Sequence, residues 1–168
     1  MIIRSVEIND LSDIVNLLSL LMTMHQEIDE EYFKTEEDVQ AYLKQWAERH
    51  LNSSSQFLLV AEETQEKKKK IVGFIAGYIK YLFPWFKIKS VGHISFLTIL
   101  PDFQRRGVGR KLEEEAKKWF EAKNVKYVEV YSNEKNAPGM SAWQAYEYLP
   151  FNKFFRKKIS PSSLPSSG

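Results

Sequence analysis

Residues 97–110 of the chain read LTILPDFQRRGVGR. An apolar run that is typical of a strand stops at Pro101, and a tight turn with two arginines and two glycines leads directly into an amphipathic stretch of helical spacing. The first N–H groups of a helix have no partner inside the helix and carry partial positive charge, so they attract anions. Gly107 and Gly109 let a ligand approach the backbone closely. The stretch therefore predicts a strand, an anion-binding turn and a helix in direct succession.

The turn favours a pyrophosphate over a single carboxylate, but it does not match two common phosphate-binding loops. A P-loop is excluded because no lysine followed by Ser or Thr comes after Gly109, and the dinucleotide-binding pattern G-x-G-x-x-G is also absent. Residues 104–109 taken alone leave a second interpretation open, in which a glycine-containing turn between a strand and a helix carries solvated arginines.

The rest of the chain alternates short apolar runs with stretches of helical periodicity. Runs rich in β-branched and aromatic residues predict strands at 2–6, 57–61, 71–79, 93–100, 125–131 and 151–159, with Lys67–Lys70 at a solvated hairpin tip. Apolar residues three and four positions apart predict helices at 11–22, 39–50, 108–120 and 138–148. No repeat or linker divides this order, so the sequence predicts one mixed α/β domain over residues 1–159 and a disordered tail at 160–168.

The composition narrows the class of protein. With 168 residues, 43% of them hydrophobic and 27% charged, the chain has the size and balance of one globular domain. A net charge of +2 is too small to indicate nucleic-acid binding through bulk charge. The absence of cysteine excludes a disulfide framework, a thiolate metal cluster and a covalent cysteine intermediate. Since neither a signal peptide nor an apolar run of about 18 residues is present, we expect a cytoplasmic protein without a membrane span.

The turn resembles the pyrophosphate loop of the GNAT superfamily of acetyl-CoA-dependent N-acetyltransferases. The pattern Gln104-x-x-Gly107-x-Gly109, between a strand and a helix, is similar at every defined position to the Q/R-x-x-G-x-G/A signature of that family. The resemblance extends over about residues 1–159. It implies an α/β (α+β) GNAT acyltransferase fold, a mixed central sheet of about six to seven strands flanked by about four helices.

A second motif near the C-terminus is similar to the same family. Where the family reads A-x-x-x-Y-E-x-x-G-F, this chain has Ala142, Tyr146, Glu147 and Phe151, and Pro150 replaces the glycine. Tyr146 thereby matches the tyrosine that often protonates the departing thiolate. Its other interpretation is a packing aromatic in the core or at an interface.

The resemblance also implies a set of residues that bind acetyl-CoA. The backbone of the predicted strand would pair with the pantetheine arm, the amides of the turn would surround the pyrophosphate, and the arginines would add positive charge. These residues are Leu97, Thr98 and Ile99 on the strand, and Gln104, Arg105, Arg106, Gly107, Val108, Gly109 and Arg110 in the turn and the helix start. No metal ligands are implied.

The general base is less well defined. An acceptor amine with a pKa near 10.4 must lose a proton before it attacks. Many family members carry a glutamate at the position that is Ser95 here. Period-two alternation would place His93, Ser95, Leu97 and Ile99 on one face, so His93 is the nearest titratable group. A chain of waters, with His93 as a hydrogen-bonded histidine at the strand end, is the alternative.

Two further features concern the remaining contacts. The family often has an asparagine seven residues before the tyrosine, where this chain has Gly139. If an insertion has moved this asparagine, Asn136 is the predicted cofactor contact.

The segment Tyr81–Phe86 is unusually apolar for a connection, so it either lines the acceptor site or joins a subunit interface, which would make a homodimer. Acidic residues surround the junction of the first two helices and favour a cationic amine, unless they form a solvated loop: Glu27, Asp29, Glu30, Glu31, Glu36, Glu37 and Asp38.

The sequence therefore predicts an N-acetyltransferase that transfers an acetyl group from acetyl-CoA to a primary amine. Direct attack in a ternary complex is expected because no cysteine can hold the acetyl group. Two other classes stay open, a non-catalytic acetyl-CoA-binding regulatory module on the same fold and a nucleic-acid-binding protein. The second lacks an aromatic signature for base stacking.

Overall fold

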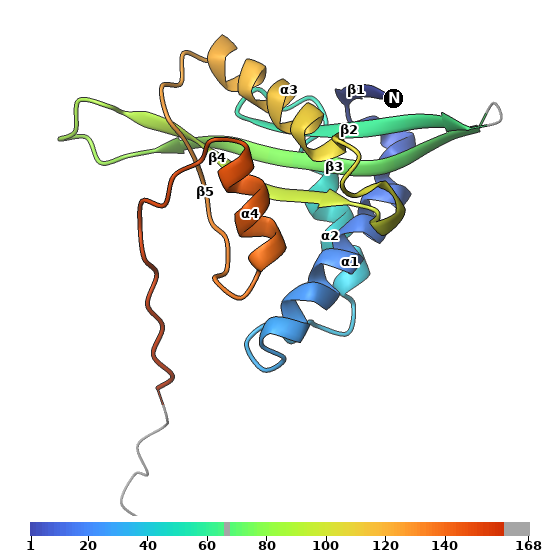
Figure 1. Ribbon diagram of the computed structural model, residues 1–168, viewed down its shortest axis with the longest axis horizontal. Coiled ribbons are helices and arrows are strands. Elements are labelled where there is room, and N and C mark those ends of the chain that lie inside the picture. Colours follow the sequence, from blue (N-terminus) through green and yellow to red (C-terminus); the bar gives the residue numbers. More distant parts are fainter. Residues whose placement is uncertain (66–67, 160–168) are drawn as a thin grey trace, which may run out of the picture.

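The core of the protein is a single twisted sheet (Figure 1). In residues 1–65 and 68–159, which the computed structural model describes, five strands lie in the order β1-β2-β3-β4-β5. The first four are antiparallel neighbours, and β5 runs parallel to β4. Their bounds are Ile2–Ser5 for β1, Gln56–Gln65 for β2, Lys68–Tyr81 for β3, Ser90–Ile99 for β4 and Val128–Val130 for β5.

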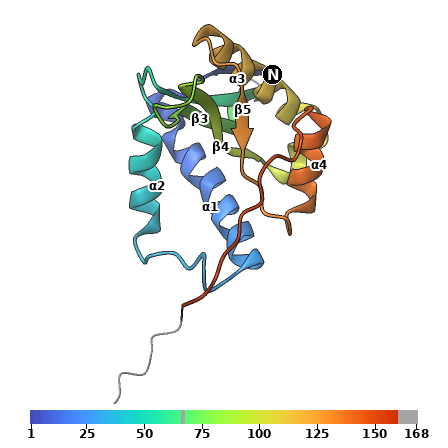
Figure 2. The same ribbon diagram turned by 90° about the vertical axis from the view of Figure 1, so that its left-hand side faces the viewer.

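Helices cover both faces of the sheet, with α3 on one face and α1 and α2 on the other (Figures 1 and 2). The bounds are Leu11–Ile28 for α1, Val39–Glu48 for α2, Val108–Ala122 for α3 and Ala137–Ala145 for α4. Alternate residues of each strand enter opposite cores, so that Phe74 packs with α1 and α2, whereas Ile75 packs with α3. The two apolar layers hold the sheet between the helices.

Most of the predicted elements are confirmed, and the mixed α/β class with its four helices is correct. Two strand predictions need correction. The strand predicted at 125–131 is only three residues long, and the one predicted at 151–159 does not form, so the described sheet has five strands instead of about six to seven. Residues 151–159 leave α4 and run away from the sheet, where no strand offers them a partner (Figure 1). The predicted disordered tail at 160–168, and Lys67 of the predicted hairpin tip, lie outside the described residues.

None of the helices formed by the described residues is long and apolar enough to span a membrane. The same part of the chain contains no group of three histidine, aspartate or glutamate side chains arranged to hold a metal ion.

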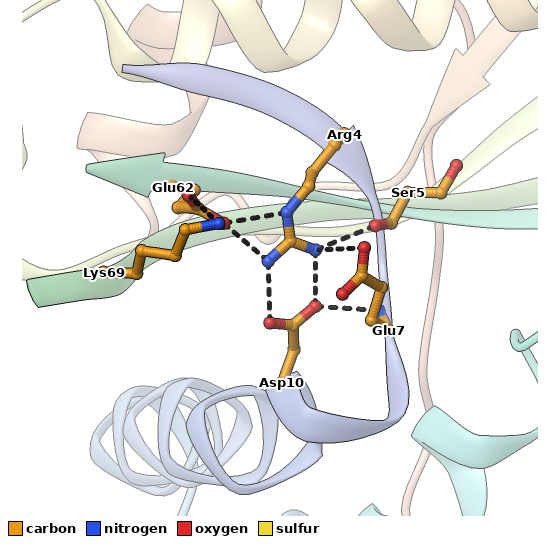
Figure 3. Close-up of polar contacts among 6 residues, drawn as sticks. All are labelled: Arg4, Ser5, Glu7, Asp10, Glu62 and Lys69. Carbon is orange, nitrogen blue, oxygen red and sulfur yellow. Dashed lines mark hydrogen bonds and ion pairs between the residues drawn. The ribbon is translucent and has the colours of Figure 1, made fainter. Parts of the chain in front are cut away.

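A buried cluster of charges ties the N-terminal strand to its neighbours (Figure 3). The Arg4 guanidinium donates to both oxygens of Asp10, at 2.7 and 2.9 Å, and its Nε donates to Glu62 at 2.9 Å. Asp10 and Glu62 are only 6% and 3% exposed. Lys69 lies 3.2 Å from the other oxygen of Glu62. One arginine therefore joins β1, the turn before α1 and β2.

The charges of this cluster are mutually stabilising. Burial opposes ionisation of Asp10, but Arg4 and the Glu7 amide outweigh it and hold the pKa of Asp10 below its usual 3.8. Hydrogen bonds from Arg4 and Lys69 likewise hold the pKa of Glu62 below 4.5. Both carboxylates therefore stabilise the fold at a pH above their ordinary pKa values of 3.8 and 4.5. This stability is lost as the pH falls below those values toward the lower pKa values of the folded protein.

We expect Arg4→Met to destabilise the fold, because it leaves buried Asp10 without its cation. The loss should be about 2–3 kcal/mol for this partly exposed pair, which lowers Tm by roughly 4–12 °C at pH 7 in a protein of this size. Thermal denaturation followed by circular dichroism measures the difference, which should shrink as the pH falls below about 4. Arg49→Met, at an exposed arginine directly after α2, is the matched control. Equal Tm values for the two variants would contradict this role for Arg4.

Candidate active site

The predicted anion-binding turn lies at the N-terminus of α3. Residues Gln104–Gly107 form the turn, and Arg105 and Gly107 have positive φ angles of 58° and 79°. A Cβ built on Gly107 would meet nothing within 4 Å. The Gln104 side chain donates to the Ile99 carbonyl at 3.1 Å and so ties the turn to the end of β4. The backbone therefore presents an open, exposed helix start of the kind that binds phosphate groups.

The three arginines near this turn have different surroundings. Arg105 and Arg106 are exposed, and the Arg106 guanidinium lies 5.6 Å from the Phe103 ring. Arg110 instead points to α4, where it donates to the Ala145 carbonyl at 2.7 Å and lies 5.6 Å from the Tyr146 ring. Arg110 thus links α3 to α4, whereas the other two arginines stay available to an anion at the turn.

Strand β4 carries the second part of the site, because half of one edge has no neighbour. β3 pairs with β4 along its whole length, but β5 pairs only with Gly92–Ile94. In the described residues, Ser95–Ile99 has no strand on that side. An edge of unpaired backbone N–H and C=O groups can hydrogen-bond an extended amide chain. Leu97, Thr98 and Ile99, the predicted pantetheine contacts, lie on this edge.

A β-bulge at Ser95 corrects the prediction for His93. Ala76 pairs with Phe96 and Gly77 with Ile94, so Ser95 is an extra residue on β4. An inserted residue reverses the alternation of side chains beyond it. His93 therefore lies on the same face as Thr98, the face covered by α1 and α2, and not on the face of Leu97 and Ile99 as simple alternation indicated.

His93 is a buried histidine beside a carboxylate. Its side chain packs against the rings of Tyr78 and Tyr131, with centroids 5.0 and 4.8 Å away. Its Nδ1 is 3.5 Å from Oε1 of Glu129, the residue beside it on β5. Burial lowers the pKa of His93, and Glu129 only partly opposes this. The imidazole is therefore neutral at pH 7 and able to accept a proton.

Glu129 also holds Lys80, whose Nζ donates both to Glu129 and to the Tyr131 hydroxyl. Sequence reasoning missed Glu129, Lys80 and Tyr131 because they meet only through the pairing of β3, β4 and β5. In the described residues, two buried side-chain atoms lack a hydrogen bond, Nδ1 of His93 and Oγ1 of Thr98. Both lie on one face of β4, with Thr98 in the stretch that has no outer neighbour and His93 beside β5, and each keeps an unused hydrogen-bonding atom.

Tyr146 lies against the start of α3. A Cβ on Gly109 would come within 2.5 Å of the Tyr146 hydroxyl, so the glycine makes room for this side chain. Burial raises the pKa of Tyr146 above 10.0, partly opposed by Arg110. The hydroxyl therefore stays protonated at neutral pH and can act as a donor. The structure brings Tyr146 next to the anion-binding turn, whereas His93 lies where β4 and β5 separate.

The neighbouring Tyr148 fixes the position of this segment. Its hydroxyl donates to Oε1 of Glu113, a buried residue of α3, at 3.1 Å. Burial raises the pKa of Glu113, and the Tyr148 hydrogen bond partly opposes that effect. The pair holds the chain after α4 against α3 and thereby keeps Tyr146 beside Gly109.

Asn136 has a structural role in the described residues. It precedes α4, and its side-chain oxygen accepts a hydrogen bond from the Gly139 N–H at 3.1 Å. This is the geometry of a helix N-cap. Its predicted contact with the cofactor stays a prediction.

Comparisons with known proteins agree with this fold. A model of the Acetyltransferase (GNAT) family matches residues 21–148, more than half of the chain. An uncharacterised N-acetyltransferase from Archaeoglobus fulgidus is 30% identical over 134 residues, which cover 80% of this chain and 83% of that protein. The chain belongs to the GNAT acetyltransferase family.

Solved structures show the same fold at low sequence identity. A mutant of the BH1408 protein from Bacillus halodurans has a TM-score of 0.80 at 16% identity, covering 95% of this chain and 100% of that one. The aminoglycoside 6'-N-acetyltransferase AAC(6')-Ig from Acinetobacter haemolyticus has a TM-score of 0.71 at 18% identity, with the same coverage. AAC(6')-Iy in complex with CoA has a TM-score of 0.69 at 17% identity, covering 94% of this chain and 100% of that one.

The contact between Gly109 and Tyr146 can be tested by a double-mutant cycle on stability. We expect Gly109→Ala to lower Tm, because its methyl group displaces the Tyr146 hydroxyl. In a Tyr146→Phe background the same change should be neutral or stabilising, since the hydroxyl is gone and alanine is the better helix former by about 1 kcal/mol. Thermal denaturation of the four proteins should give a coupling energy of about 0.5–3 kcal/mol. Additive effects would show that the hydroxyl does not lie against Gly109.

Proposed function

We propose that the protein transfers the acetyl group of acetyl-CoA to a primary amine, by direct attack in a ternary complex. The observation that carries the proposal is the open helix start at Gly107, next to the unpaired edge of β4. A linear ligand with a pyrophosphate at one end and amide groups along its arm fits both features at once. Family membership and the CoA bound to AAC(6')-Iy support the same choice of substrate.

Each part of the site has a role in this proposal. The turn amides and Arg105 and Arg106 would bind the pyrophosphate, and the backbone of Leu97–Ile99 would align the pantetheine arm. Thr98 would add its buried hydroxyl. A backbone N–H on the free edge of β4 would stabilise negative charge on the thioester oxygen during attack. The chain has no cysteine, so the amine itself must be the nucleophile.

Two side chains would move protons. His93 is neutral, buried and next to Glu129, so it can accept a proton from the ammonium group directly or through a water chain. Tyr146 keeps its proton and can donate it to the departing thiolate, whose conjugate acid has a pKa near 8.5. The lowered pKa keeps His93 unprotonated and the raised pKa keeps Tyr146 protonated at neutral pH, so each group starts in the form that its role requires.

The acceptor in this proposal is a cationic amine. Glu27, Glu30 and Glu31 line a depression of about 620 Å³ at the end of α1. The acidic residues there already attract the chain's own cations, since Arg156 pairs with Asp29 and Lys158 with Glu31. Such a negative field would attract positively charged amines to this end of α1. Aminoglycoside acetyltransferases are among the structural neighbours.

The proposal is tested by calorimetric titration with acetyl-CoA, followed by a thiol-release assay against a panel of amines. We expect saturable binding, thiol release only with an acceptor, and intersecting double-reciprocal lines. Gly107→Asn is the binding control, because asparagine tolerates the positive φ but adds a side chain where the phosphates approach. Its affinity should fall by about tenfold or more. Binding without thiol release for any amine would indicate a regulatory module, and parallel lines would exclude the ternary complex.

The roles of the two proton-transferring residues predict a common kinetic pattern. Tyr146→Phe and His93→Gln should each lower kcat by about 10²–10⁴-fold, because positioned proton transfer is lost. Affinity for acetyl-CoA should stay close to wild type, which separates chemistry from binding. Tyr127→Phe, at an exposed tyrosine outside the site, is the control for loss of a hydroxyl. A kcat for Tyr146→Phe within about twofold of wild type would mean that this tyrosine only packs.

A further inference from the structure

Residues 81–89, the aromatic loop, join β3 to β4 at one end of the sheet and project beyond the helices (Figure 1). Two backbone hydrogen bonds close the loop. The Leu82 N–H donates to the Lys89 carbonyl at 2.8 Å, and the Phe86 N–H donates to the Phe83 carbonyl at 3.1 Å. The aromatic loop therefore has a defined shape at the extremity of the molecule, where a flat surface can reach it.

The aromatic loop presents large rings to solvent. The exposed fractions are 77% for Tyr81, 61% for Phe83, 71% for Trp85 and 50% for Phe86. Phe83 and Trp85 stack face to face, with ring centroids 4.6 Å apart and planes only 5° apart. In the described residues, these two rings and that of Phe86 pair only with one another. A contiguous exposed aromatic cluster of this kind marks an interaction surface.

The charge of the aromatic loop has a single sign. Lys87 and Lys89 are both exposed and directly follow the rings. The sequence has no aspartate or glutamate between Glu66 and Asp102, so the loop carries no acidic residue that could offset these lysines. Apolar rings beside uncompensated ammonium groups complement a surface that is apolar inside and negatively charged outside.

We propose that the aromatic loop binds reversibly to the surface of membranes that contain anionic lipids. Tryptophan and tyrosine favour the boundary between headgroups and acyl chains, because one end of each ring is apolar and the other forms hydrogen bonds. Lys87 and Lys89 extend their ammonium groups toward the headgroup phosphates. Lysine is depleted at protein–protein interfaces, so this combination favours lipid over a protein partner.

The expected binding is weak and depends on salt. Each lysine close to an anionic surface strengthens the partition by about fivefold, and the rings add an apolar contribution that salt does not screen. The lysine contribution extends only about a Debye length from the surface, so it falls as the ionic strength rises. Both contributions are independent of acetyl transfer, and the inference therefore does not rest on the proposed function.

Sedimentation of the full-length protein with vesicles tests the proposal. We expect binding at low salt to vesicles of equal parts phosphatidylcholine and phosphatidylglycerol. Trp85→Ser combined with Phe86→Ser should lower the partition by about tenfold or more, with an unchanged circular dichroism spectrum, because both side chains are exposed. Tyr42→Ser, at a residue of α2 that is 57% exposed, is the control and should bind like wild type.

Two outcomes of this experiment would overturn the inference. One is a wild type that stays in the supernatant, and a wild type that self-associates through the aromatic loop instead belongs to this case. The other is a double variant that binds the vesicles as well as wild type does.

The contribution of charge is tested at Lys87, because the Lys89 ammonium donates to the Pro84 carbonyl and so helps to shape the loop. Lys87→Gln should lower the partition onto the anionic vesicles by about fivefold and have little effect with phosphatidylcholine alone. Lys44→Gln, at an exposed lysine of α2, is the matched control. Equal losses for the two variants would show attraction to the whole molecule and contradict a role for the aromatic loop.

Insertion of the rings is tested by quenching of tryptophan fluorescence with vesicles whose lipids carry bromine on the acyl chains. The chain has four tryptophans, and of these only Trp85 lies in the aromatic loop. Trp85→Phe keeps a ring at this position, so we expect it to sediment with the vesicles nearly as well as wild type but to lose most of the quenching. Quenching that is the same in wild type and Trp85→Phe would place the loop outside the bilayer and overturn the inference.

Discussion

The short pairing between β4 and β5 is the constraint on which the functional features depend. Only three residue pairs join the two strands, from Gly92–Val128 to Ile94–Val130. Beyond them β4 continues beside β3 as far as Ile99, while the chain after β5 leaves the sheet toward α4. In the described residues, the edge of Ser95–Ile99 that faces away from β3 has no strand beside it and can receive a ligand, and His93 and Glu129 meet where the strands separate.

The candidate active site also depends on how α4 and the segment after it are held against α3. Arg110 donates to the Ala145 carbonyl at the end of α4, and Tyr148, in the segment after α4, donates to Glu113 of α3. Gly109 then allows the Tyr146 ring to approach closer than any other residue would permit. Burial of the Glu113 carboxyl is unfavourable on its own and raises its pKa. The hydrogen bond that offsets this cost comes from Tyr148, which lies in the same segment as Tyr146. The stability of this contact and the placement of the candidate acid are thus coupled.

Charge serves two different purposes in the molecule. The Arg4 cluster is buried and internally satisfied, so it secures β1 against β2 and the start of α1. The acidic residues at the end of α1 are more exposed and bind the cations of the C-terminal segment. Exposed ion pairs of this kind are weak and exchange readily with other cations. The same acidic surface is therefore suited both to hold that segment and to receive a charged acceptor.

Local sequence was enough to predict the turn and the helix start. Glycines and arginines between a strand and an amphipathic stretch indicate an anion site through backbone geometry alone, which depends on few neighbours. Gly107 was identified from this local pattern, and Tyr146 from its match to a short motif of the family. The predicted helices were also formed, because their periodicity is a property of each segment.

Long-range packing decided the rest, because pairing partners distant in sequence leave no local signal. The bulge at Ser95 arises from register with β3, and it moved His93 to the opposite face from Leu97. Glu129 and Lys80 reach His93 only across three strands, and Asn136 turned out to cap α4. Residues 151–159 have the pattern of a strand, but such a pattern indicates only that the segment is able to form one. Whether it forms depends on an edge to pair with, and that edge exists only after the sheet has assembled.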